Sequence, residues 1–134
     1  MNMIGVERTN GTGSDAATGF AAVGREPAPI DLIHLARQTF GSSDLERDVL
    51  NLFVQQGAGL ARRIAEAANA TERGEIAHRL KGSAFAVGAI RVGRLAQALE
   101  SAATPVEIRG LTTDLAQAVE EVERFVASLL APAA

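Results

Sequence analysis

Apolar residues recur at helical spacing through most of this chain. The longest such stripe follows Thr104-Pro105-Val106-Glu107, where Thr can cap a helix, Pro takes the first helical position and Glu closes a capping box. From there apolar residues recur every three or four positions as far as Leu129. This pattern predicts a long amphipathic helix that packs against other helices.

Three further stretches show the same period, and a shorter one precedes them. The expected helices run from Asp31 to Phe40, from Ser43 to about Ala68, from the Asn69-Ala70-Thr71 turn to Gly88, and from Ile90 to Ala103. Four substantial amphipathic helices with short loops predict an all-α fold. The expected architecture is an antiparallel up-down-up-down four-helix bundle with an additional short N-terminal helix.

The first 28 residues lack this period. Between Asn10 and Gly24 they are mostly Gly, Thr, Ser and Ala, which cannot bury enough apolar surface to offset the entropy of ordering. Pro27-Ala28-Pro29 resists helix formation and marks a boundary. A chain of 134 residues suits a single core. We therefore expect a flexible N-terminal tail over residues 1–28 and one bundle domain over residues 29–131.

Composition argues against several classes of function. The net charge of −3 gives no electrostatic reason to bind nucleic acid or an anionic membrane, and the lack of cysteine excludes thiolate chemistry. No stretch approaches the roughly 18 apolar residues of a membrane span, so we expect a soluble, cytoplasmic protein. The two histidines, His34 and His78, do not form a metal-ligand motif, and His34 is expected to be a surface residue.

The stretch His78-Arg79-Leu80-Lys81 contains one of the two histidines and the only lysine of the chain. At about 100° per residue, His78 lies opposite the apolar stripe of its helix, so its imidazole should face solvent. Lys81 falls within a turn of His78 on the same side. That apolar stripe consists of Ile76, Leu80, Ala84 and Val87.

Glycines lie one turn before and one turn after the histidine, at Gly74 and Gly82. Because glycine disfavours helix, the pair suggests a surface kept bare for another molecule, although Gly74 could mark a frayed turn and Gly82 a close helix contact. Phe85 could contact a partner or be tucked under a neighbouring helix. Arg79 could add positive charge to the site or be an ordinary solvated residue.

The run Ala77-His78-Arg79-Leu80-Lys81-Gly82-Ser83-Ala84, followed by Val87-Gly88-Ala89 and Leu99-Glu100, resembles the signature of histidine-containing phosphotransfer (HPt) domains of bacterial phosphorelays. The resemblance covers about residues 29–130. It departs from the family at Ala84-Phe85-Ala86, where a polar Asn or Gln is common. These apolar side chains cannot give the imidazole a secondary hydrogen bond from that region.

The resemblance implies that His78 accepts a phosphoryl group from an aspartyl phosphate on a receiver domain, including that of a hybrid histidine kinase, and passes it to a response-regulator aspartate. It implies that Lys81 neutralises phosphoryl charge and that Gly82 leaves room for the phosphoryl group. Gly82, Gly74, Arg79 and Phe85 would then form the receiver docking face. The chain would need no cofactor and would not hydrolyse ATP, because Mg²⁺ and its carboxylates belong to the receiver.

Two other interpretations remain open. The dimerisation domain of a histidine kinase also presents a histidine on a helix, but an acidic residue normally follows that histidine, whereas Arg79 follows here. The expectation is accordingly a monomer. The second alternative is a helical-bundle adaptor that binds receiver domains without relaying phosphoryl groups.

Overall fold

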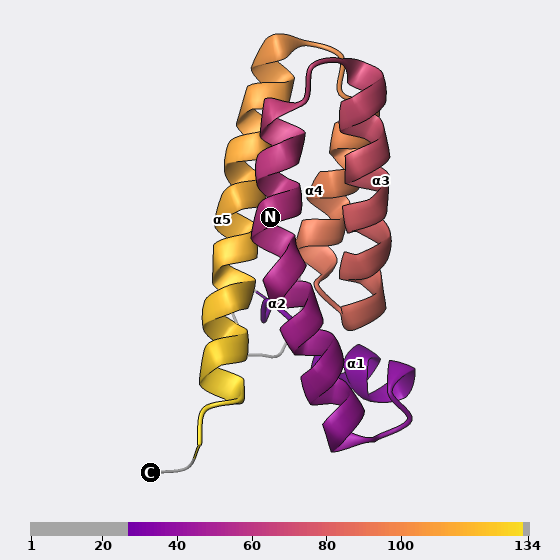
Figure 1. The fold of residues 1–134 in the computed structure, drawn as a ribbon, viewed down its shortest axis with the longest axis vertical. Helices are drawn as coiled ribbons and strands as arrows, with labels where there is room; N and C mark the ends of the chain where they lie inside the picture. The colour runs from indigo at the N-terminus through magenta and orange to yellow at the C-terminus, as the bar shows by residue number, and fades with distance from the viewer. Residues whose placement is uncertain (1–26, 133–134) are drawn as a thin grey trace, which may run out of the picture.

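The computed structural model describes residues 27–132, so residues 1–26 of the predicted tail lie outside the described part. The five helices of the described part are α1 (Leu32–Gln38), α2 (Ser43–Glu66), α3 (Ala70–Val87), α4 (Ile90–Ser101) and α5 (Pro105–Leu129). The predicted all-α fold is confirmed, as is the four-helix bundle with a short N-terminal helix (Figure 1). No helix among these residues is both long and apolar enough to cross a membrane.

The four long helices form a closed ring in which each packs against the next along the chain. α2 and α4 run in one direction, α3 and α5 return, and α5 closes the ring against α2 (Figure 1). Every long helix contributes side chains to one shared core. Its fully buried large residues include Leu50, Ile64, Leu80, Leu99, Leu115 and Val122.

Both ends of α3 and the start of α5 follow the capping residues that the sequence indicated. Asn69 accepts a hydrogen bond from the backbone N–H of Glu72 at 2.8 Å, and the Thr104 hydroxyl accepts one from Glu107 at 3.1 Å. Gly88 ends α3 with a φ of +86°. A Cβ atom at Gly88 would lie 2.8 Å from the carbonyl oxygen of Asp31, so both the backbone conformation and the available space require glycine.

α1 is attached to the end of α3, and this attachment corrects the prediction for His34. The backbone N–H of Asp31 donates to the carbonyl oxygen of Gly88 at 2.8 Å. The Nε2 atom of His34 lies 2.7 Å from the carbonyl oxygen of Phe85, and His34 is partly buried. His34 is therefore not a free surface residue, because it fastens α1 to the last turn of α3.

Two details of the first helices also differ from expectation. α1 ends at Gln38, and Phe40 leaves the predicted apolar stripe because it adopts a φ of +54° in the following turn, where it is 93 % exposed. Ser42, rather than Ser43, caps α2 and accepts from the N–H of Leu45 at 3.2 Å. Leu45 is exposed, since α2 packs on its neighbours through the face that carries Leu50.

Candidate functional site

His78 lies on the outer side of α3, away from the core of the bundle. Its side chain is 71 % exposed, which confirms the prediction that the imidazole faces solvent. The exposure follows from the helix period, because the buried residues of α3 occupy the opposite side. Those residues are Ile76, Ala77, Leu80, Ala84 and Val87.

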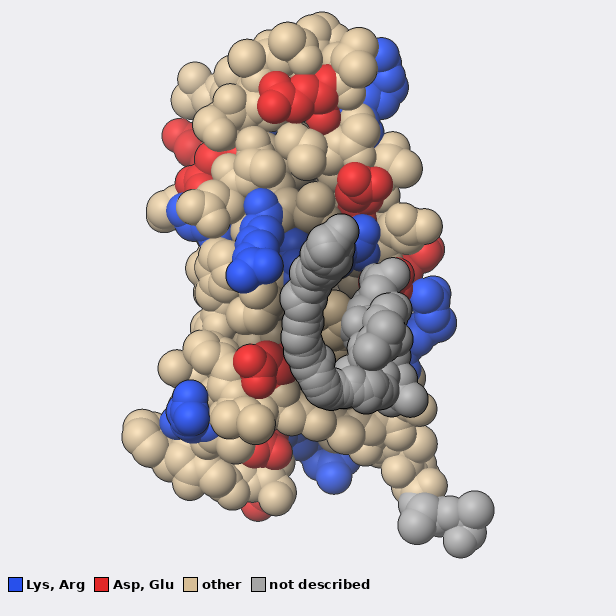
Figure 2. Space-filling model, turned by 180° about the vertical axis from the view of Figure 1, so that it is seen from behind, with Lys and Arg blue, Asp and Glu red and all other residues tan. Residues whose placement is uncertain are grey.

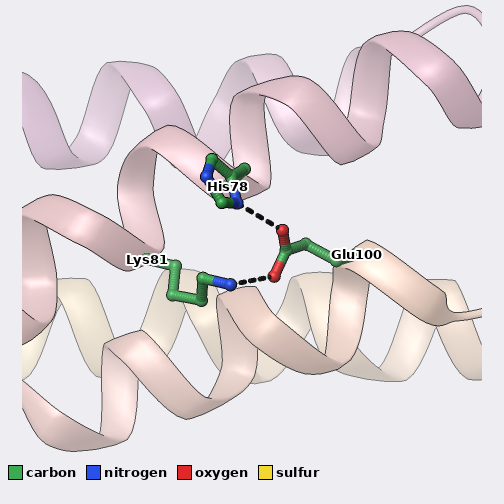
Figure 3. A network of polar contacts seen from close by, with 3 residues as sticks. All are labelled: His78, Lys81 and Glu100. Atoms are coloured by element: carbon green, nitrogen blue, oxygen red, sulfur yellow. Dashed lines mark hydrogen bonds and ion pairs between the residues drawn. The ribbon is translucent and has the colours of Figure 1, made fainter.

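A carboxylate from the neighbouring helix joins the histidine to the lysine. Glu100 near the end of α4 brings Oε2 to 2.7 Å from Nδ1 of His78 and Oε1 to 2.7 Å from Nζ of Lys81 (Figure 3). The side chains of Glu100 and Lys81 are each 24 % exposed, so this ion pair is partly shielded from water. The Glu100 carboxylate thus binds both the imidazole of His78 and the ammonium of Lys81.

No role for Glu100 was predicted from the sequence, although Leu99-Glu100 belongs to the HPt-like signature. The spacing of Glu100 and His78 around the predicted turn at Gly88 could have predicted their contact. His78 precedes Gly88 by ten residues and Glu100 follows it by twelve, and such positions lie side by side when two antiparallel helices meet at a tight turn. Glu100 is also the only acidic residue of α4.

The charges around Glu100 keep it ionised. The Lys81 ammonium, and then the hydrogen bond from His78, lower the pKa of the Glu100 carboxyl from its ordinary value. An ionised carboxylate can only accept hydrogen bonds, so the neutral imidazole must donate from Nδ1. The lone pair is then on Nε2, which points away from Glu100 (Figure 3). The arrangement can therefore act as a nucleophile at Nε2.

The surface on one side of His78 is open. A Cβ atom placed on Gly82 would meet nothing within 4 Å, so no neighbouring helix packs closely there and that alternative is wrong. Gly74 lies in a shallow hollow that His78, Arg79 and Glu100 also line, and Arg79 is exposed. The nearest atom to a Cβ on Gly74 would be the carbonyl oxygen of Glu100 at 4.0 Å. Both glycines leave the backbone of α3 accessible near the imidazole.

Phe85 turns toward α4 instead of standing free of the bundle. Its ring covers Gly93, where an added Cβ atom would lie 2.7 Å from the Cε1 atom of the ring. Phe85 is partly buried by this contact. The position favours the packing interpretation of Phe85, although the side chain is not fully enclosed.

Within residues 27–132, no three side chains of His, Cys, Asp or Glu gather in a group that could hold a metal ion. The site consists instead of an exposed imidazole, one ammonium, one carboxylate and an adjacent bare stretch of helix. These groups can attack an electrophile, neutralise negative charge beside it and admit a second molecule.

Comparison with known proteins gives one match. A family model described as Hpt domain matches residues 48–130, which extend from α2 to the end of α5 and include His78, Lys81 and Glu100. No curated protein and no solved structure matches the chain.

Proposed function

The chain belongs to the Hpt domain family, and on this premise we propose that His78 accepts a phosphoryl group from a receiver-domain aspartyl phosphate and passes it to a response-regulator aspartate. Histidine phosphotransfer in phosphorelays is the role of the family. The observation that carries the proposal for this chain is the exposed imidazole of His78, whose Nδ1 is bound to Glu100 at 2.7 Å. That contact leaves Nε2 as the nucleophile.

In the proposed step, the Nε2 lone pair of His78 attacks the phosphorus atom of the aspartyl phosphate. An N–P bond forms while the bond between phosphorus and the aspartyl oxygen breaks, which returns a carboxylate to the receiver. The imidazole already carries its proton on Nδ1, so no proton has to leave. Positive charge develops on the ring, and the Glu100 carboxylate 2.7 Å from Nδ1 stabilises it.

In this proposal, Lys81 neutralises the negative charge of the phosphoryl group. Phosphoryl transfer depends mainly on alignment and on neutralisation of the oxygens, and a lysine supplies a compact charge on a flexible stem. In the free protein the ammonium is paired with Glu100 at 2.7 Å. We infer that Lys81 turns from this carboxylate toward the phosphoryl oxygens when they arrive, while Glu100 keeps its bond to the imidazole.

The bare surface beside His78 would admit the partner. Gly82 lies one turn after the histidine with open space above it, so a receiver domain can bring its aspartate close to Nε2. The proposed partners are receiver domains of response regulators and of hybrid histidine kinases, which would supply Mg²⁺. We also propose a cytoplasmic monomer, and the closed ring of four helices around one shared core supports the monomeric state.

The proposal is tested by incubating the protein with a receiver domain that carries labelled aspartyl phosphate. Acid-labile label should appear on the wild type and not on His78→Gln. The matched control is His34→Gln, which removes the other histidine of the chain, at the junction of α1 and α3, and should still accept label. Label on His78→Gln would refute the assignment of His78. If no receiver of the same cell transferred label to the wild type, the adaptor interpretation would replace the relay.

A further inference from the structure

A second surface lies at the other end of α4 from Glu100. It is an apolar groove between the start of the described chain, the first turns of α4 and the middle of α5. We refer to it as the α4–α5 groove, and it is defined by Pro27, Ile30, Ile33, Leu95 and Val122 with Arg91 at its edge. None of its lining residues belongs to the hollow around His78.

The floor of the groove is part of the core, but no other residue within 27–132 covers its walls. Ile30 and Val122 are almost fully buried at the floor, whereas Ile33 is 68 % exposed and Leu32 is 43 % exposed on the wall. A cluster of exposed apolar side chains around a concave floor is characteristic of a surface that another segment covers.

The edge of the groove has little unbalanced charge to offer. Two acidic residues, Asp31 and Glu121, and two basic residues, Arg91 and Arg94, line the groove, so their charges balance. The guanidinium of Arg91 is paired with Glu121 at 3.1 Å. On the part of the face that Figure 2 shows uncovered, acidic and basic side chains are interspersed among uncharged residues, and neither sign forms a continuous patch. An uncharged apolar segment therefore fits this groove better than an acidic or basic one.

The chain carries such a segment next to the groove. We propose that the run Phe20-Ala21-Ala22-Val23 covers the α4–α5 groove of the same molecule, with Phe20 and Val23 against Ile33 and Leu95. Phe20 is the only aromatic residue among residues 1–26, and Asp15 is the only charged residue between Asn10 and Gly24. The run thus combines a large apolar anchor with almost no charge.

The run Phe20-Ala21-Ala22-Val23 is linked covalently to the groove through Pro27. Residues 1–26 join the described structure at Pro27, which itself lines the groove. Val23 is four residues from Pro27 and Phe20 is seven, so the extended chain reaches at most about 14 Å and about 25 Å respectively. A short tether also raises the effective concentration of the run to the millimolar range, so weak apolar contacts suffice.

Paramagnetic relaxation tests the proposal on the full-length protein, because the chain contains no cysteine and a single one can be labelled. A nitroxide on Thr18→Cys should broaden the backbone amide signals of Leu95 and Val122 in the groove. It should not broaden those of Leu52 on the exposed side of α2. The matched control carries the same label with Phe20→Ser and Val23→Ser, which keep the tether and remove the apolar anchors.

Each possible result of the relaxation experiment either supports or overturns the proposal. Broadening of the groove amides that the double serine variant largely removes supports the proposal. Equal broadening in both proteins, or none in either, overturns it, because proximity through the tether alone does not depend on Phe20. A mixture of spin-labelled protein with separate ¹⁵N-labelled protein should show no broadening. Broadening in the mixture would identify a second copy as the occupant and would also overturn the proposal.

Discussion

The carboxylate of Glu100 lies 2.7 Å from Nδ1 of His78, across the hairpin that α3 and α4 form. The second oxygen of the same carboxylate binds Lys81, so the orientation of the imidazole and the position of the ammonium depend on one residue of α4. An acceptor on Nδ1 selects the tautomer in which Nε2 is unprotonated. Glu100 is therefore a positioning residue, and three of its properties can be separated: its charge, its hydrogen bond and its effect on stability.

Glu100→Gln should slow phosphoryl acceptance about threefold to tenfold, since a neutral hydrogen bond is weaker than a charge-assisted one by about 1 kcal/mol. A glutamine amide can also donate to Nδ1 and so permit the unreactive tautomer. Glu100→Ala should slow acceptance further because it removes the contact altogether. Rapid-quench measurements with a phosphorylated receiver give the rates.

The ¹⁵N chemical shifts of the His78 ring provide a readout that a purely structural role would not affect. In the wild type they should report a proton on Nδ1, and in Glu100→Ala a mixture of tautomers. Unchanged ring shifts together with unchanged rates would show that the contact with Glu100 has no part in transfer.

The lowered pKa of Glu100 predicts a specific dependence of stability on pH. Because the carboxyl titrates below its ordinary value of 4.5 in the folded protein, the ionised form stabilises the fold above that value. This contribution is lost as the pH falls through the folded-state pKa. The difference in unfolding free energy between the wild type and Glu100→Gln should be largest near neutral pH and should shrink in acid.

Urea unfolding at a series of pH values measures this difference. Lys81→Met provides the control, because the Lys81 contact is the main cause of the lowered pKa of Glu100. In a Lys81→Met background the difference between Glu and Gln at position 100 should vary less with pH. A difference that stays constant from neutral to strongly acidic pH would show that the ion pair does not stabilise the fold.

The parts of the site that one helix determines could be predicted from the sequence. The exposure of His78 and the nearby position of Lys81 follow from the period of α3, and Gly88 as the end of α3 follows from the need for a positive φ. The end of α1 was harder to predict. Thr39 and Phe40 leave the helix for a tight turn, although the apolar pattern continues through Phe40.

Contacts between helices were largely missed, because they depend on register and rotation that periodicity within one helix does not determine. Glu100 reaches His78 only once α3 and α4 are aligned at Gly88. Leu52 is apolar and lies one residue before the buried Phe53, yet it is 52 % exposed because α2 faces its neighbours through Leu50 and Phe53.

Gly82→Leu should raise stability and lower the rate of transfer. Glycine in a helix interior costs about 0.5–1 kcal/mol relative to residues such as Ala or Leu, and the space around the Cβ position is empty, so the added side chain meets no protein atom near its Cβ. Under the proposed function, the same side chain would stand where a receiver approaches His78. Thermal unfolding and phosphotransfer rates measure the two effects.

Gly110→Leu is the matched control for this substitution. Gly110 lies in α5, and a Cβ atom there would also meet nothing within 4 Å. This variant should gain similar stability and transfer at the wild-type rate. A Gly82→Leu protein that transfers normally would show that receivers do not require the bare surface beside His78.

The contact between Phe85 and Gly93 distinguishes the two interpretations of Phe85. Gly93→Ala would place Cβ 2.7 Å from the ring, and overpacking of this kind costs about 1–3 kcal/mol. Phe85→Leu should relieve the clash, so the double variant should be more stable than the sum of the single effects predicts. Urea unfolding of the four proteins gives this coupling energy.

Transfer rates of the same four proteins then separate packing from docking. If Phe85 serves mainly to pack α3 against α4, Phe85→Leu should transfer at close to the wild-type rate, since leucine still covers Gly93. A large loss of rate without a loss of stability would instead assign the Phe85 side chain to the receiver docking face. Coupling in stability but not in rate is the expected result, because the ring of Phe85 lies against α4 while the imidazole of His78 faces solvent.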